Sequence, residues 1–204
     1  IPAVEAALCE PLSCSAYAVN QTGMGMEDTV VISGLGAIGM GMLQFALLRN
    51  PKRVIGIDTN DALCEIAKKL GAAEVLNPMK EDVTKRIMEL TDGVGCDIYM
   101  EATGNPASVE TGMNCLRKQG MLFIYSVFKK KAEIDLNQIS EFKELRVIGG
   151  HLSPGAFPYT IDCLEKGKIN AKVMVTDIFA LNEIDEAMSA KKPDRVSIKT
   201  VLVP

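Results

Sequence analysis

The sequence predicts an α/β fold, an open, doubly wound parallel sheet of about six strands with helices on both faces. Two observations support this. Segments with strand character alternate with amphipathic helical segments along most of the chain. Residues 29–58 also form a strand, a glycine-rich turn, a helix and a second strand, which is the βαβ unit of a parallel sheet. With 204 residues, 48% of them apolar, the chain can bury a substantial core.

The turn of this unit is Gly34-Leu-Gly36-Ala37-Ile38-Gly39, the spacing typical of dinucleotide binding. Gly34 permits the tight turn, Gly36 lets the backbone approach a pyrophosphate, and Gly39 permits close packing of helix on strand. Ala37 and Ile38 begin the helix, whose unpaired N–H groups and dipole point at the phosphates. The sequence therefore predicts that these five residues bind the cofactor.

The second strand of the unit ends at Asp58, nineteen positions after Gly39. An acid at this point accepts hydrogen bonds from the ribose hydroxyls of adenosine and repels a 2′-phosphate. Thr59 and Asn60 follow, and neither can hold a phosphate by charge. We therefore predict NAD rather than NADP, with Asp58 and Thr59 in the site.

The other elements follow from periodicity and from start and stop signals. The helix after Asp58 is stopped by Gly71, and Asn105-Pro106 is a cap followed by a first-turn proline. Apolar stripes predict helices over 63–70, over 83–90 and, with Val109, Met113 and Leu116, after Pro106. An opening helix is expected at 4–19, and strands at 74–76, 97–101, 121–125, 145–150 and 196–203. The strand count matches a doubly wound sheet of the Rossmann type.

Ligands of such sheets lie outside the carboxyl ends of the strands, where the strand order reverses. This rule predicts that Thr103 and Gly104, after the fourth strand, and Ser126 and Val127, after the fifth, border the cofactor. His151, the only histidine, follows the sixth strand. It has no carboxylate or serine partner at a matching spacing, which favours a loop residue at the cofactor or a surface histidine over a general base.

Charge and cysteine usage exclude several classes of protein. The net charge of −4 and pI of about 5.2 argue against partners such as nucleic acid or an anionic membrane. The cluster 129–131, three lysines, is interpreted as a solvated loop, with phosphate steering as the alternative. Six scattered cysteines form neither a zinc ribbon nor a redox dithiol. No apolar run is long enough for a membrane span, and we expect a cytoplasmic protein with small-molecule partners.

The motifs together resemble the cofactor-binding half of zinc-dependent medium-chain dehydrogenases, in the branch of sorbitol, polyol and threonine dehydrogenases. The resemblance spans nearly the whole chain. It rests on Glu10-Pro-Leu-Ser-Cys-Ser-Ala-Tyr-Ala, the glycine turn with Asp58, Gly71-Ala72, and Asp97 leading to Glu101-Ala-Thr-Gly104. It implies that the nicotinamide lies beside Tyr125-Ser-Val127 and near His151. Two positions depart from the family pattern: Leu63 replaces a usual Lys or Arg, and Ser126 replaces a frequent glycine.

The resemblance implies hydride transfer between NAD and a secondary alcohol or polyol, with a catalytic zinc that polarises the substrate oxygen. In that family the zinc ligands and the proton relay come mostly from an N-terminal domain to which nothing here corresponds. We therefore expect a fragment that is inactive alone and binds no zinc, with its catalytic residues unknown. Only Glu10 is expected near the metal.

The resemblance also implies a division of the chain and an assembly. We expect a leading helix at 1–20, an NAD-binding Rossmann domain at 21–180, and a helix and strand at 181–204 that return to the missing catalytic domain. The edge formed by the sixth strand is expected to join a homodimer or tetramer. Two alternative functions stay open: a zinc-independent medium-chain reductase, and a non-catalytic NAD-binding module.

Overall fold

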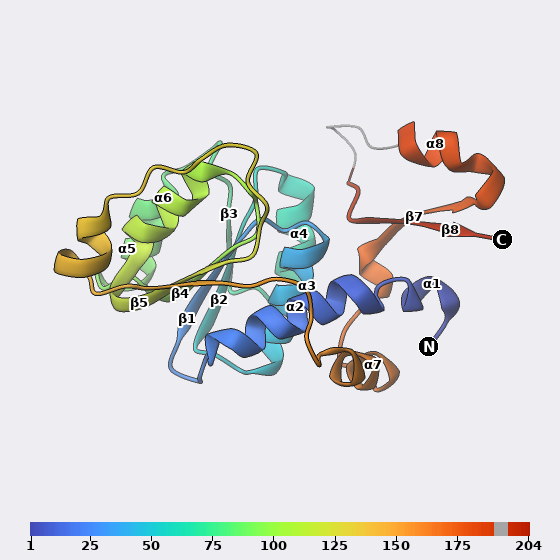
Figure 1. Ribbon diagram of the computed structural model, residues 1–204, viewed down its shortest axis with the longest axis horizontal. Helices are drawn as coiled ribbons and strands as arrows, with labels where there is room; N and C mark the ends of the chain where they lie inside the picture. Colours follow the sequence, from blue (N-terminus) through green and yellow to red (C-terminus); the bar gives the residue numbers. More distant parts are fainter. Residues whose placement is uncertain (190–195) are drawn as a thin grey trace.

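The computed structural model describes residues 1–189 and 196–204. Its main sheet has six strands, all parallel, in the order β3-β2-β1-β4-β5-β6. Figure 1 labels β1 to β5 of this sheet. The strands are β1 Thr29–Ser33, β2 Arg53–Ile57, β3 Glu74–Leu76, β4 Cys96–Glu101, β5 Leu116–Ile124 and β6 Arg146–Gly149. The order reverses between β1 and β4, which are adjacent. The predicted doubly wound sheet is confirmed.

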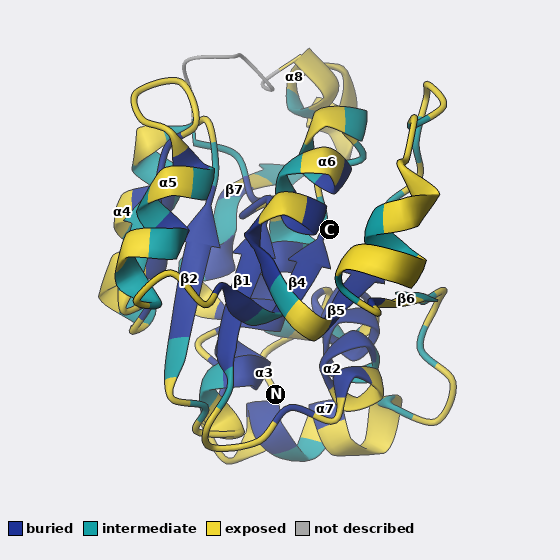
Figure 2. Cartoon of the chain, turned by 90° about the vertical axis from the view of Figure 1, so that its left-hand side faces the viewer, coloured by how far each residue is buried: buried dark blue, intermediate teal, exposed yellow. Residues whose placement is uncertain are grey.

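Helices cover both faces of this sheet, and their exposed outer faces contrast with the buried strands (Figure 2). The bounds are α1 Ala3–Ala6, α2 Cys9–Thr22, α3 Ala37–Leu48, α4 Asp61–Leu70, α5 Val83–Leu90, α6 Pro106–Cys115, α7 Phe157–Glu165 and α8 Ile184–Ser189. Buried residues of α2, α3, α4 and α7 form one core cluster with one sheet face. Those of α5 and α6 form a second cluster with the other face. Successive residues of β1, Val30 and Val31, belong to different clusters, as the two-residue period of a strand requires.

Helix α3 is buried on nearly all sides because α2 covers the face that the sheet leaves free. The two helices approach closely at Gly41, where an added Cβ would lie 2.4 Å from Ser15 Oγ. Ser15 Oγ also donates to the carbonyl of Ile38, 2.8 Å away in the first turn of α3. The leading helix thus fixes the start of the helix that follows the glycine turn.

Two predicted element boundaries were wrong. The expected opening helix is two helices, α1 and α2, because Pro11 has no N–H to offer the carbonyl of Ala7 and its ring obstructs a continuous helix. The apolar stripe after Pro106 predicts Leu116 in a helix, but α6 ends at Cys115 and Leu116 begins β5. Its backbone is already extended (ψ 139°), and its side chain is buried in the cluster beneath α6.

The C-terminal segment contains an element that the sequence analysis missed. Strand β7, Val175–Ala180, pairs in parallel with β8, Lys199–Val203, to form a separate two-stranded sheet. The predicted final helix is present as α8, and the predicted final strand begins at Lys199 rather than at Val196. Residues 190–195 of the expected C-terminal segment lie outside the described residues. The expected division of the chain at residue 180 stays a prediction.

Two further features of the described residues are the state of the cysteines and the length of the apolar helices. All six cysteines are free thiols. None of the helices described here is long and apolar enough to cross a membrane.

Candidate functional site

The glycine turn leaves β1 at the point where the sheet order reverses, and its three glycines are required for different reasons. Gly34 has φ +93°, and a Cβ there would lie 2.7 Å from the carbonyl oxygen of Ala102. A Cβ on Gly39 would lie 1.7 Å from the carbonyl oxygen of Gly34. A Cβ on Gly36 would meet nothing within 4 Å, and the φ of Gly36 is an ordinary −67°. The fold itself requires Gly34 and Gly39, whereas Gly36 faces open space.

Gly36 is also the N-cap of α3, and no side chain caps this helix end. The first helical hydrogen bond runs from Met40 N to Gly36 O, at 2.8 Å. The N–H groups of residues 37–39, in the first turn of α3, have no partner inside the helix, and they carry the positive end of the helix dipole. The open space beside Gly36 therefore suits an anionic group.

Asp58 follows β2 directly and holds the glycine turn in place. Its Oδ2 accepts from Leu35 N at 2.7 Å, and its Oδ1 accepts from Asn60 N at 2.9 Å. The side chain is half-buried, so the carboxylate joins the turn on one side and faces the cleft on the other. A carboxylate oxygen has more than one lone pair, and acceptor capacity remains for a ligand hydroxyl.

Asn77, after β3, links two neighbouring loops. It is 7% exposed, and its Nδ2 donates to Thr59 O at 3.0 Å and to Asp61 Oδ1 at 2.8 Å. Lys80 pairs with the other oxygen of Asp61 at 2.6 Å. The loop that follows Asp58 is therefore held from the side of β3.

Glu101, at the end of β4, is a fully buried carboxylate. Its Oε1 accepts from Thr103 N at 2.7 Å, from Gly104 N at 3.1 Å, and from the hydroxyl of Thr103. Its Oε2 is buried and has no hydrogen-bond partner in the described structure. The backbone carbonyl of Glu101 accepts from Tyr125 N at 3.0 Å and from Ser126 Oγ at 3.4 Å. One residue thus organises the loops after β4 and β5.

Two adjoining cavities lie along these loops. The larger, about 470 Å³, extends from the glycine turn past Asp58 to the start of α6. The smaller, about 280 Å³, lies between the start of α3 and the loop after β5. Ala102 and Thr103 line both cavities, so the loop after β4 separates them. The pair forms one elongated cleft across the switch point of the sheet, which is where such sheets bind ligands.

The structure brings most of the predicted site residues to this cleft. The larger cavity is lined by Gly34, Gly36, Asp58, Thr59 and Thr103 among others. The smaller cavity is lined by Ile38, Thr103, Ser126 and Val127 among others. Ala37 and Gly39, in the first turn of α3, and Gly104, in the loop after β4, do not line either cavity.

His151 and Glu10 lie outside both cavities, and both are exposed. The loop of His151 is tied to the cleft, because Tyr125 OH donates to Leu152 O at 2.5 Å. Glu10 lies in the first turn of α2 and accepts from Cys14 Sγ at 3.3 Å. Burial raises the pKa of the Cys14 thiol above its ordinary value. Among the described residues, no three side chains of metal-ligating type gather to hold an ion.

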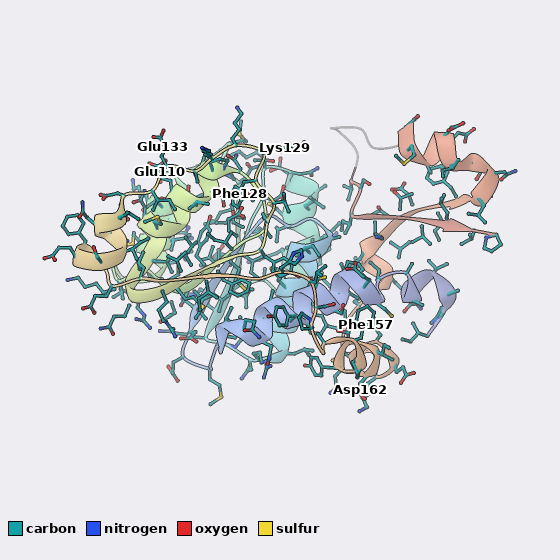
Figure 3. The ribbon with its side chains drawn as sticks, in the orientation of Figure 1. Glu110, Phe128, Lys129, Glu133, Phe157 and Asp162 are labelled. Carbon is teal, nitrogen blue, oxygen red and sulfur yellow. The ribbon has the colours of Figure 1, made fainter. Side chains whose placement is uncertain are left out.

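The lysine cluster 129–131 is exposed, as the solvated-loop interpretation predicts. With Phe128 it belongs to the loop that passes over α6, where Figure 3 labels Lys129 and Glu110. This loop and α6 line another cavity, which shares no residue with the elongated cleft. The geometry does not bring the cluster to the glycine turn.

The residues of the cleft region that were not predicted as site residues include five polar ones. Ser33 ends β1, Tyr99 lies in β4, Ser108 lies in α6, and Asn77 and Glu101 act as described above. Three of the five carried a readable signal: Ser33 and Glu101 are polar residues at the ends of apolar strands, and Asn77 precedes a proline that closes a strand.

Comparison with known proteins agrees with this architecture. Residues 37–166 match the family model described as zinc-binding dehydrogenase. The chain is 39% identical over all of its 204 residues to an erythritol/L-threitol dehydrogenase of Mycolicibacterium smegmatis, of which it covers 56%. It is 30% identical to a sorbitol dehydrogenase of Halalkalibacterium halodurans, with 98% of this chain and 58% of the relative covered.

A solved structure from Sinorhizobium meliloti, described as a zinc-binding dehydrogenase bound to NADP, superimposes with a TM-score of 0.91 at 27% identity. The match covers 98% of this chain and 59% of that one. The chain therefore spans a little over half the length of the curated relatives and of the solved structure.

Proposed function

The chain belongs to the zinc-binding dehydrogenase family, and we propose that it is the cofactor-binding part of an NAD-dependent alcohol or polyol dehydrogenase. The polyol class rests on the relatives, an erythritol/L-threitol dehydrogenase and a sorbitol dehydrogenase among them. A cytoplasmic location belongs to the same proposal, which six free thiols among the described residues support.

One observation carries the proposal: the open space at Gly36 lies in the same cavity as the carboxylate of Asp58. A pyrophosphate beside Gly36 would accept from the unpaired N–H groups of α3. A ribose attached to it would meet Asp58, which has acceptor capacity for the hydroxyls. Since the fold does not exclude a side chain at position 36, a ligand that approaches the backbone explains the glycine there.

Cofactor choice follows from the same carboxylate. Asp58 would repel a 2′-phosphate, and the neighbouring cavity wall is formed by Thr59 and Leu63, which carry no charge. The nearby cation, Lys80, is paired with Asp61. We therefore assign NAD to this chain, although the Sinorhizobium meliloti relative was solved with NADP.

The chain contributes binding and orientation to the reaction, whereas NAD, when bound, supplies the hydride acceptor. With adenosine at Asp58, Thr103 and the smaller cavity would receive the other half of the dinucleotide. There Ile38 and Val127 offer apolar walls, and the hydroxyl of Ser126 is held by the carbonyl of Glu101. These residues would hold one face of the nicotinamide and leave the other face to a substrate.

The described residues do not by themselves fit a zinc site. A catalytic zinc takes three protein ligands, and the described residues gather no such group. Glu10 is a single exposed carboxylate, next to the thiol of Cys14. We propose that the other ligands, the proton relay and the substrate pocket belong to the part of the relatives that this chain does not match, with Glu10 near the metal.

A fluorescence titration with NADH and NADPH tests the cofactor assignment. The chain has no tryptophan, so the emission of the reduced nicotinamide is the signal. We expect NADH to bind at least tenfold more tightly than NADPH. Gly36→Val should abolish binding, and Asp58→Ser should reduce the preference for NADH.

Val94→Ala, in an exposed loop away from the cleft, is the matched control and should bind as the unchanged protein does. Equal affinities for NADH and NADPH would contradict the role of Asp58. Failure of the folded protein to bind either would contradict the proposed function.

We also propose a homodimer or tetramer through β6, the last strand in the sheet order. Its outer edge has no strand partner among the described residues, and Val147 on it is 39% exposed. Edges of this kind are commonly paired or covered. Light scattering at micromolar concentration should give a multiple of the monomer mass, and Val147→Asp should lower it while Val94→Asp does not. A monomeric mass for the unchanged protein would remove this proposal.

The segment 181–204, with α8 and β8, is proposed to return to the unmatched part of the protein. Apolar side chains of this segment are exposed, notably Leu181, Ile184 and Met188. We likewise propose residues 21–180 as the NAD-binding domain and 1–20 as the junction that leads into it.

A further inference from the structure

A separate cavity lies between three helices, away from the dinucleotide cleft. It has a volume of about 250 Å³ and shares no residue with either cavity of the cleft. Helix α7 packs against α2 here (Figure 1), and the end of α3 completes the wall. The polar side chains that line it are Tyr17 and Asn20 of α2, Arg49 directly after α3, and Tyr159 of α7. We call it the three-helix cavity.

The wall of this cavity carries an uncompensated positive charge. Of the described residues that line it, Arg49 alone is charged. No carboxylate forms an ion pair with Arg49 among residues 1–189 and 196–204. Asp162, on the same helix as Tyr159, is paired with Lys166 at 2.6 Å. The three-helix cavity therefore favours an anionic ligand.

Hydrogen-bond donors of the wall match a carboxylate. Arg49 Nη2 donates to Asn20 Oδ1 at 2.8 Å, which ties the guanidinium to α2. A guanidinium has five N–H donors, so this bond leaves others for a ligand, and the amide nitrogen of Asn20 adds two more. The flat fork of an arginine binds a carboxylate through two parallel hydrogen bonds. Arg49 can therefore hold a carboxylate at this wall.

The rest of the cavity suits a small aromatic body. Tyr17 and Tyr159 line it from different helices, and the ring of Tyr159 packs against that of Phe45, with the centroids 5.9 Å apart. Aromatic side chains pack favourably on a flat ring. Pockets for drug-sized ligands have about 300–1,000 Å³, so this smaller cavity has room for a compact ligand and not for a second dinucleotide.

We propose that the three-helix cavity binds a small aromatic carboxylate, with the carboxylate on Arg49 and the ring against Tyr17 and Tyr159. The carboxylate supplies the charge that the wall lacks, and the ring covers the two tyrosines. This site goes beyond the proposed dehydrogenase function and does not depend on it, because none of its residues lines the dinucleotide cleft.

Nuclear magnetic resonance of the purified protein labelled with ¹⁵N-glycine tests the site with benzoate as the probe. Gly155 lies in the wall of the three-helix cavity, and Gly36 lies in the cleft. Benzoate should shift the amide signal of Gly155 in a saturable way and leave that of Gly36 unchanged. Acetate and inorganic phosphate, which lack the ring, and benzyl alcohol, which lacks the charge, should bind about fivefold more weakly or worse.

Substitutions of Arg49 separate its charge from its shape. This residue is exposed, so its variants should keep the fold. Arg49→Met should weaken benzoate binding about tenfold, and Arg49→Lys, which keeps the charge without the fork, should weaken it less. Arg86→Met, on α5 at the other face of the sheet, is the matched control and should leave benzoate binding unchanged.

Three results would overturn the proposal. An unchanged Gly155 signal at tens of millimolar benzoate would remove the site. Binding that Arg49→Met does not weaken, or that Arg86→Met weakens equally, would remove the role of Arg49. Acetate or phosphate that binds as tightly as benzoate would remove the aromatic class of ligand. NADH titration, which tests the cleft, should give the same affinity for Arg49→Met as for the unchanged protein, so the two sites are judged separately.

Discussion

The contrast between Gly36 and Gly39 gives a prediction that separates folding from binding. Both residues belong to the same turn, and we consider the substitution of each by alanine. A Cβ introduced at position 39 would lie 1.7 Å from the carbonyl oxygen of Gly34, well inside contact distance with backbone atoms. Since neither backbone segment can move without disturbing β1 or α3, Gly39→Ala should destabilise the fold by about 3 kcal/mol or more.

Gly36→Ala should leave the stability nearly unchanged. The new Cβ meets nothing within 4 Å, and φ −67° suits any residue. Alanine is a poorer N-cap than glycine, by roughly 0.5–1 kcal/mol. The alanine also restricts the unfolded chain, which stabilises by about 0.4–1 kcal/mol. The two effects offset each other to within about 0.5 kcal/mol.

Binding should show the opposite order of sensitivity. A methyl group at position 36 occupies the space in which a pyrophosphate would approach the backbone. Loss of one hydrogen bond to a charged group amounts to about 1.5–3 kcal/mol, a factor of roughly 10 to 150 in the dissociation constant. We therefore expect Gly36→Ala to be a folded protein with greatly weakened NADH binding.

Urea denaturation of each variant measures stability, and NADH titration of the folded protein measures affinity. The reasoning would be refuted by a Gly36→Ala variant as unstable as Gly39→Ala, because the space beside Gly36 would then not be open. It would equally be refuted by a stable Gly36→Ala variant that binds NADH with unchanged affinity. The second result would mean that neither the fold nor the ligand requires a glycine at this position.

Three further predictions concern buried groups. Glu101→Leu leaves two N–H groups of the 103–104 loop unpaired and should lower the free energy of unfolding by about 2–4 kcal/mol. Glu101→Gln keeps the acceptor and should lower the free energy of unfolding by less than half as much. Urea denaturation measures both. Asn77→Leu should raise the dissociation constant for NADH several-fold, because the loop after Asp58 loses the hydrogen bonds that the Asn77 side chain donates to it; an unchanged constant would contradict this role. Burial raises the pKa of Cys115 to about 11 from an ordinary 9.0, so the folded state holds the proton more tightly than the unfolded chain. The resulting stability is present below pH 9 and is lost as pH rises toward 11, by about 1 kcal/mol at pH 10. Urea denaturation across this range should show a shallower loss for Cys115→Ala than for the control Cys9→Ala, and equal slopes would contradict it.

The sequence was sufficient for the elements whose signals are local. The glycine turn and Asp58 lie within one βαβ unit, so their spacing alone predicted a cleft that the structure has at that place. Caps behaved in the same way: Asn105 accepts from Ala107 N at the start of α6, and Gly71 ends α4 with φ +116°. Each of these features depends on residues within one short stretch of the chain.

The errors arose where a local pattern was ambiguous. Leu116 fits both the apolar stripe of α6 and the start of β5, and the pairing of β5 with β4 decided for the strand. Strand β7 was missed because its pairing partner, β8, lies about twenty residues further along the chain. Intrinsic preference for a strand is weak when the partner is unknown.

The sequence by itself determined the fold class, the position of the phosphate-binding turn and the acid that would face a ribose, because all three follow from spacing within short segments. The tertiary structure alone decided which distant side chains meet. Ser33, Tyr99 and Ser108 come together only through the register of β1 with β4 and through the packing of α6 on the ring of Tyr99 at Gly112. Strand register and helix seating depend on packing across the whole core, and no local pattern encodes them.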